Sequence, residues 1–130
     1  MRKEIANWLK MVDYDLATAN KIFKAGRYVY VIFMCHLAIE KALKALVCKE
    51  TNKIAPKTHD LIYLLSLGNV KLSGELLDFI GMINNAGIVT RYPEDLSKLI
   101  SSYPRGVTQK YLKNTLEVIK CIKKDPRLKK

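Results

Sequence analysis

The chain has 130 residues, of which 49% are hydrophobic, and this favours one compact domain with one hydrophobic core. It is too short for a two-domain enzyme with separate cofactor and substrate halves, and its apolar content argues against intrinsic disorder. Lys and Arg number 23 against 12 Asp and Glu, which gives a formal net charge of +11. This excess favours anionic partners such as nucleic acid, nucleotides, acidic proteins or lipid headgroups.

The spacing of the cysteines and the pattern of the N-terminal residues indicate in which cellular compartment the protein resides. Cys35, Cys48 and Cys121 have neither zinc-site spacing nor a disulfide framework, which fits a reducing compartment. The N-terminus does not have the pattern of a signal peptide. The longest apolar run, Tyr28–Cys35, is too short to cross a bilayer. We therefore expect a cytoplasmic protein with no membrane partner.

The hydrophobic pattern of the first half of the chain is helical. Apolar residues recur every three or four positions from Ile5 to Phe23, which predicts a helix that ends before Gly26. A second helix is predicted from about Tyr28 to Lys49. Its first residues are β-branched and aromatic and would also suit a strand. The pattern continues unbroken into the strong helix formers of Leu37–Leu46, so we predict a helix throughout.

The second half predicts shorter elements after a polar loop at 51–57. Together with the first two helices they predict an all-α fold, an up-and-down bundle of four to five helices that forms a single domain over residues 1–125. The predicted elements are a short helix His59–Leu67 capped by Thr58, a helix Gly74–Ala86 capped by Ser73, a connection over 88–106 with a helical turn near Asp95–Ser101, a last helix Val107–Lys124, and a frayed basic tail over 126–130.

Four segments occur in a characteristic order along this helical pattern. Together they resemble the HEPN domain, and the resemblance extends roughly from Ile5 to Ile122. No segment is diagnostic by itself, but the ordered set is more specific. The segments are Gly26-Arg27-Tyr28, the run from Cys35-His36-Leu37-Ala38-Ile39-Glu40 to Leu46, Thr58-His59-Asp60-Leu61, and Arg91-Tyr92-Pro93.

The resemblance implies a helical bundle that is commonly a homodimer and that takes part in nucleotide or RNA transactions. It also implies a minimal nucleotidyltransferase as partner in a toxin–antitoxin pair. The ribonuclease branch of the family carries an Arg followed by a His within four to six residues. This sequence departs from that motif, because neither Arg91 nor Arg105 has such a His. Metal-independent RNA cleavage needs a group that moves a proton near neutral pH, so the departure argues against nuclease activity.

His36, Glu40 and Lys44 are spaced by four residues and line one stripe of the second predicted helix. Apolar neighbours turn the stripe inward, where polar groups need partners. Two interpretations stay open: a pocket floor that binds phosphate or base edges, or an internal ladder in which Glu40 accepts hydrogen bonds from His36 and Lys44. The His36–Glu40 spacing also suits a metal, but the chain has no second Glu-x-x-His motif. We therefore predict neither a metal site nor a cofactor.

Two later segments carry further candidates. His59 is interpreted as a residue packed on the bundle end in preference to a proton shuttle, because no nucleophile is visible beside it. The proline after Tyr92 restricts that residue to extended backbone. This could hold Arg91 and the Tyr92 ring outward together, for phosphate and for base stacking. Alternatively, Tyr92 folds over the bundle edge and Arg91 pairs with Glu94 or Asp95.

The last predicted helix and the connection before it are strongly basic. They form either a solvated face or a salt-sensitive site for polyanions. The residues of this candidate basic surface are Lys98, Arg105, Lys110, Lys113, Lys120 and Lys124.

The leading hypothesis is a non-catalytic module associated with nucleotides or RNA, which acts as a homodimer with a nucleotidyltransferase-type partner. One alternative is a toxin ribonuclease with an atypical site, in which Arg91 stabilises the phosphate and His36 or His59 moves the proton. Another is a purely structural dimerisation adaptor. We assign no catalytic residue, and the candidate nucleotide- or RNA-binding residues are His36, Glu40, Lys41, Lys44, His59, Arg91 and Tyr92.

Overall fold

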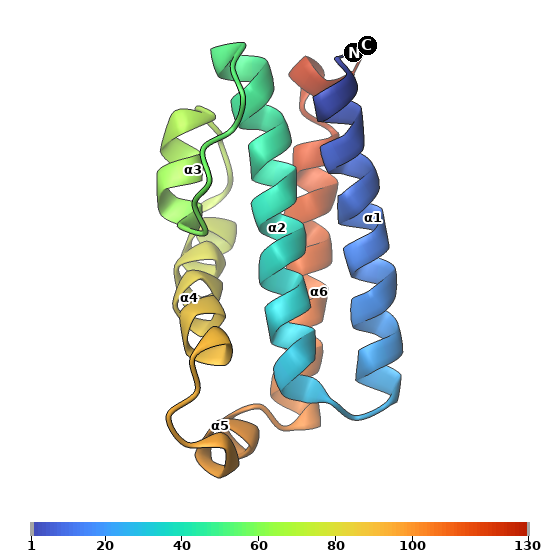
Figure 1. The fold of residues 1–130 in the computed structure, drawn as a ribbon, viewed down its shortest axis with the longest axis vertical. Helices are drawn as coiled ribbons and strands as arrows, with labels where there is room; N and C mark the ends of the chain where they lie inside the picture. Colours follow the sequence, from blue (N-terminus) through green and yellow to red (C-terminus); the bar gives the residue numbers. More distant parts are fainter. Residues whose placement is uncertain (1, 130) are drawn as a thin grey trace.

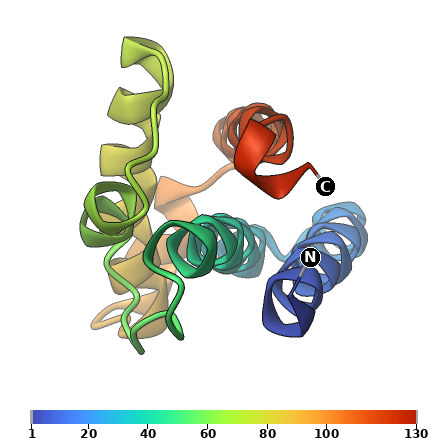
Figure 2. The same cartoon turned by 90° about the horizontal axis from the view of Figure 1, so that it is seen from above.

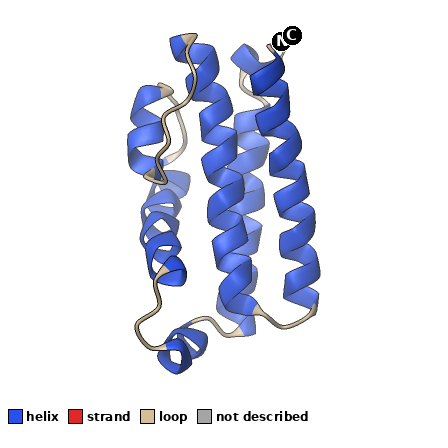
Figure 3. Cartoon of the chain, in the orientation of Figure 1, coloured by secondary structure: helices blue, strands red, loops and turns tan. Residues whose placement is uncertain are grey.

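A computed structural model describes residues 2–129 as a bundle of helices without any strand in that range (Figures 1 and 3). The all-α prediction is therefore confirmed. Four long helices form the body of the bundle, and short helices connect them or follow them. None of the helices in the described range is long and apolar enough to cross a membrane. The elements are α1 (Lys3–Lys24), α2 (Tyr28–Thr51), α3 (Leu61–Leu67), α4 (Gly74–Arg91), α5 (Leu96–Ser102), α6 (Arg105–Lys123) and the 3-10 helix η1 (Pro126–Leu128).

Helix α2 occupies the centre of the bundle, with α1, α4 and α6 arranged around it (Figure 2). Its side chains are buried on almost every side, including those of Val31, Ile39 and Leu46. A helix that is hydrophobic all round is stable only inside a bundle. This explains why the β-branched start of α2 is helical, as predicted, and not a strand.

Helix α4 continues to Arg91, so the predicted end at Ala86 is wrong. Gly87 lies inside the helix and packs directly against the His36 ring of α2. The buried Thr90 hydroxyl donates to the Ala86 carbonyl oxygen at 2.9 Å, so its hydrogen bond is made within α4 itself. The Asn-Ala-Gly sequence near residue 86 indicates a helix end locally, but contact with α2 outweighs that preference.

The cap predicted for α3 is also wrong. Asp60, not Thr58, caps the helix, and its carboxylate accepts from the backbone N–H groups of Ile62 and Tyr63. Thr58 Oγ1 instead accepts from the Asp60 N–H at 3.1 Å. His59 therefore lies in irregular chain between these two residues and is free of the geometry of a helix.

The tail after α6 does not fray over its described residues, contrary to the prediction. Leu128 is buried, and the Arg127 guanidinium bridges three parts of the fold. It contacts the carboxylates of Asp125 and Glu50 at 2.9 and 2.7 Å and donates to the Gly68 carbonyl oxygen at 2.6 Å. This network fixes residues 126–129 across the end of α2, whereas residue 130 lies outside the described range.

The close approach of α2 and α4 at Gly87 leads to a stability prediction. A Cβ at this position would lie 2.1 Å from His36 Cδ2, so Gly87→Ala must displace a buried ring. We expect it to lower the free energy of unfolding in urea by about 1–3 kcal/mol. Gly81→Ala is the matched control, because its Cβ meets nothing within 4 Å in the same helix. That change should be neutral or stabilise by up to about 1 kcal/mol. Equal effects of the two variants would contradict the close packing.

Candidate functional site

The centre of the candidate site is the carboxylate of Glu40, which is buried in the middle of α2. Its Oε2 accepts a hydrogen bond from Lys44 Nζ, one helical turn further along, at 3.1 Å. Lys44 Nζ also lies 5.5 Å from the centre of the Trp8 ring on α1. A buried carboxylate needs charged or hydrogen-bonding partners, because its desolvation is costly. Lys44 is the first of these partners.

His59 reaches the other oxygen of the same carboxylate from the segment that precedes α3. Its Nδ1 lies 2.9 Å from Glu40 Oε1, and we assign the proton to Nδ1 because a carboxylate only accepts. The segment is held in place where the Leu61 N–H donates to Asn84 Oδ1 of α4 at 2.9 Å. The His59 side chain is 61% exposed while that of Glu40 is 5% exposed. His59 therefore connects the buried carboxylate to solvent.

Arg91 at the end of α4 completes the group. Its Nη2 lies 3.7 Å from Glu40 Oε1, and its guanidinium carbon lies 4.9 Å from the centre of the Phe33 ring. The interpretations in which Arg91 points outward beside Tyr92, or pairs with Glu94 or Asp95, are therefore wrong. Arg91 turns inward because Glu40 supplies a buried negative charge and Phe33 supplies an aromatic face. We call Glu40, Lys44, His59, Arg91 and His36 the Glu40 cluster.

His36 is the most deeply buried member of the Glu40 cluster. Its Nδ1 lies 3.8 Å from Glu40 Oε1, beyond hydrogen-bond distance, and within residues 2–129 that nitrogen has no hydrogen-bond partner. The pKa of His36 is lowered to about 4, mainly by burial and also by the positive charge of Arg91, while the negative charge of Glu40 acts in the opposite direction. His36 is therefore neutral at physiological pH and supports the cluster without adding charge.

Other predicted candidates lie apart from the Glu40 cluster. Lys41 faces α1 and pairs with the buried Asp15, with 2.7 Å between Nζ and Oδ2. Tyr92 is 74% exposed at the end of α4. The lysines predicted for the basic surface lie on the solvent sides of α5 and α6, and Arg105 lies over the Phe23 ring. These basic residues do not join Arg91 in one stripe, because Arg91 turns inward.

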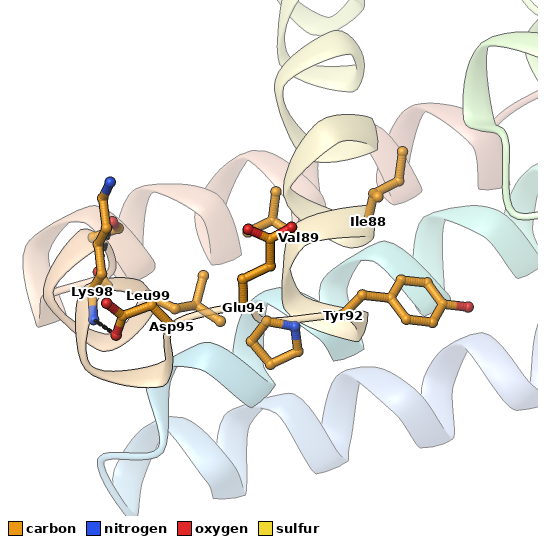
Figure 4. A pocket seen from close by; sticks show the side chains of 9 residues that line it. Ile88, Val89, Tyr92, Glu94, Asp95, Lys98 and Leu99 are labelled. Carbon is orange, nitrogen blue, oxygen red and sulfur yellow. Dashed lines mark hydrogen bonds between the residues drawn. The ribbon is translucent and has the colours of Figure 1, made fainter.

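A hollow at the end of α4 has no member of the Glu40 cluster among its lining residues (Figure 4). It has a volume of about 620 Å³ and lies between the end of α4 and α5. Ile88, Val89 and Tyr92 contribute its apolar side, and Glu94 and Lys98 contribute charge. The described residues contain no group of three His, Cys, Asp or Glu side chains that could hold a metal ion. The contacts of Glu40 with Lys44, His59 and Arg91 suit hydrogen bonding, proton transfer or anion binding.

Sequence reasoning did not identify Phe33, Asn84 or Gly87 as parts of the site. Phe33 offers its ring to Arg91, Asn84 fixes the chain that carries His59, and Gly87 makes room for His36. Phe33 lies three residues before His36, on a neighbouring part of the same helix surface, and this spacing could have indicated it. The roles of Asn84 and Gly87 depend on how α4 packs against the rest of the bundle, and no local sequence pattern indicates this packing.

Comparison with known proteins places this chain in a family. A family model described as the HEPN domain matches residues 5–125, and the chain belongs to this family. A solved structure, TT1696 from Thermus thermophilus, has a TM-score of 0.79 and 20% identity, covering 94% of this chain and 98% of that chain. An archaeal HEPN homologue, ST0689, has a TM-score of 0.74 and 19% identity, covering 95% and 97%. A search of curated proteins found no match.

The lowered pKa of His36 leads to a prediction about acid stability. The unfolded chain binds a proton at His36 near pH 6.5, whereas the folded chain resists protonation down to about pH 4. Between these values the unfolded state holds more protons, so the folded state loses stability as the pH falls and keeps this contribution above pH 6.5. His36→Gln removes the titration. We expect the decrease in unfolding free energy between pH 7 and pH 4.5 to be smaller in the variant, by roughly 2–3 kcal/mol. Parallel pH profiles would contradict this account.

Proposed function

We propose that this HEPN-family protein binds phosphate groups of nucleotides or RNA at the Glu40 cluster and does not cleave them. The single observation that carries the proposal is the position of Arg91. Its guanidinium is 3.7 Å from Glu40, and within residues 2–129 its side chain makes no hydrogen bond. The donors of an arginine form a fork that matches a phosphate. Arg91 is therefore oriented by a carboxylate while its hydrogen-bonding capacity remains available.

The charge balance of the Glu40 cluster supports the same proposal. Lys44 and Arg91 carry two positive charges against the single carboxylate of Glu40, while burial keeps His36 neutral. An anion that approaches past the exposed His59 would meet this excess of positive charge in a partly desolvated setting, where electrostatic attraction is stronger than in water. The net charge of +11 also attracts polyanions over a longer range.

A direct test measures binding of a labelled single-stranded RNA by fluorescence anisotropy at increasing salt concentration. Arg91→Gln should weaken binding about tenfold or more, because a charge-assisted contact to phosphate contributes about 1.5–3 kcal/mol. Lys113→Gln is the matched control, since it removes the same charge from the exposed face of α6, and it should change affinity less than about threefold. Equal losses in both variants would assign binding to the basic surface. Salt-insensitive partner binding with no RNA binding would favour a structural adaptor.

RNA cleavage is a second candidate function, favoured by the contact between His59 and Glu40. A buried carboxylate that accepts from His59 Nδ1 leaves Nε2 as a proton acceptor on an exposed ring. This arrangement is typical of general bases in hydrolytic sites. Gel analysis of the RNA after the binding experiment distinguishes the two functions. Cleavage that is lost in His59→Ala and in Arg91→Gln would replace the non-catalytic proposal.

We also propose that the protein acts as a homodimer and pairs with a nucleotidyltransferase-type protein in a toxin–antitoxin-like system. Family membership supports the nucleotidyltransferase-type partner. The outer face of α4 supports the homodimer. This helix contains no lysine, although the protein has a net charge of +11, and it exposes Met82, Ile88 and Val89. Exposed apolar faces of this kind mark interaction surfaces, and a second copy can cover the same face in a two-fold arrangement without strong charge repulsion.

The dimer is tested by sedimentation or light scattering of the purified protein. Ile88→Asp places a charge twice in a two-fold interface and should convert dimers to monomers. Leu116→Asp is the matched control, because it introduces the same charge on an exposed apolar residue of α6, and it should leave the mass unchanged. A monomeric parent protein, or a dimer that persists in Ile88→Asp, would contradict an interface on α4.

A further inference from the structure

Helix α5 lies at the end of the bundle where the chain turns from α1 to α2 (Figure 1). Residues of this turn, of the start of α2 and of α5 line a second hollow. It has a volume of about 280 Å³. We call it the aromatic hollow, since three tyrosines line it together with an arginine, a glycine and three aliphatic residues. The residues that line it are Gly26, Arg27, Tyr28, Val29, Tyr30, Leu96, Ile100 and Tyr103.

Two tyrosines that line the aromatic hollow, Tyr28 and Tyr103, each pack against another aromatic ring. Tyr28 packs against Phe23 with 5.5 Å between ring centres, and Tyr103 meets Tyr111 edge-on at 5.8 Å. Gly26 has a φ of 78° and makes the tight turn that brings the start of α2 to this place. The walls therefore come from three parts of the chain and are formed before any ligand arrives, which is typical of binding sites.

The polar groups of the aromatic hollow are available for a ligand. Within residues 2–129 the guanidinium of Arg27 has no ion pair or hydrogen bond. Arg105 does not line the hollow, but it lies over the ring of Phe23, which packs against Tyr28, with 4.9 Å between its guanidinium carbon and the ring centre. Burial raises the pKa of Tyr103, and the neighbouring Tyr111 raises it further, so its hydroxyl remains a proton donor. The site combines flat apolar walls, hydroxyl donors and positive charge.

These features select the class of ligand. The exposed Tyr30 ring offers a stacking face, Leu96 and Ile100 of α5 add apolar surface, and Arg27 suits a phosphate. Base stacking on aromatic side chains combined with nearby positive charge is the common means of binding single strands. We propose that the aromatic hollow binds an unpaired nucleobase of a single-stranded nucleic acid, with an adjacent phosphate on Arg27.

The aromatic hollow and the Glu40 cluster both include residues of α2. Tyr30 precedes Phe33 by one helical turn, and Phe33 carries Arg91 on its ring at 4.9 Å. Along the helix axis Tyr30 and Glu40 are about 15 Å apart, so a strand of a few nucleotides spans the distance. The inference rests on the proposed function, since it adds a base-binding subsite to a surface that already binds phosphate.

The test compares two labelled strands of equal length, an oligoadenylate and an abasic strand with the same phosphates, by fluorescence anisotropy. The parent protein should bind the oligoadenylate about fivefold more tightly or better, which is the expected effect of stacking one base. Tyr30→Ala should remove this preference, and Tyr30→Phe should keep it because the ring remains. Tyr14→Ala is the matched control: Tyr14 and Tyr30 are 76% and 59% exposed, and Tyr14 lies on α1 outside the aromatic hollow.

The outcomes separate the two proposals. Equal affinity of the parent protein for both strands would overturn the aromatic hollow and leave phosphate binding intact. A base preference that survives in Tyr30→Ala, with its fold verified by circular dichroism, would also overturn it. If neither strand binds even at low salt, the proposed function itself fails. Arg91→Gln should weaken both strands alike and should leave the ratio between them unchanged.

Discussion

The arrangement of this bundle depends on one carboxylate, that of Glu40, placed inside the central helix. A negative charge in such a position needs partners, because the cost of removing it from water is otherwise several kcal/mol. Its partners come from different parts of the chain: Lys44 from α2, His59 from the segment before α3, and Arg91 from the end of α4. The path of the chain from α2 to α4 therefore passes around this charge, and α4 is long enough to bring Arg91 to it.

Buried ion pairs are a weak source of stability, since their attraction roughly offsets the loss of hydration. The Glu40 cluster is better understood as a device that fixes geometry. Glu40 holds His59 in one orientation and keeps Arg91 against Phe33, although each of these side chains has many rotamers. A ligand that binds to pre-oriented groups loses less free energy in ordering them. The hydrophobic contacts of α2 supply the stability that such a polar centre requires.

The long helices can be predicted from the sequence because their period is local information. The stripe of His36, Glu40 and Lys44 is recognisable for the same reason. The orientation of Arg91 cannot be predicted, since it depends on how far α4 extends and which neighbour it meets. Asn-Ala-Gly near residue 86 favours a helix end locally, whereas in the structure the helix continues and Gly87 packs against the ring of His36. The local pattern predicts that His59 is the first residue of a helix. In the structure Asp60 caps the helix instead, and His59 lies before it in irregular chain.

The contact between Gly87 and His36 also limits how this protein can diverge. The ring of His36 occupies the space that any side chain at position 87 would need, so the two residues form one packing unit. A larger residue at 87 becomes acceptable only after a smaller one has replaced the histidine, and such an intermediate contains a cavity. Single substitutions at either position therefore pass through a less stable protein. Bundles of this kind can share the fold while they separate into lineages that retain both residues or neither.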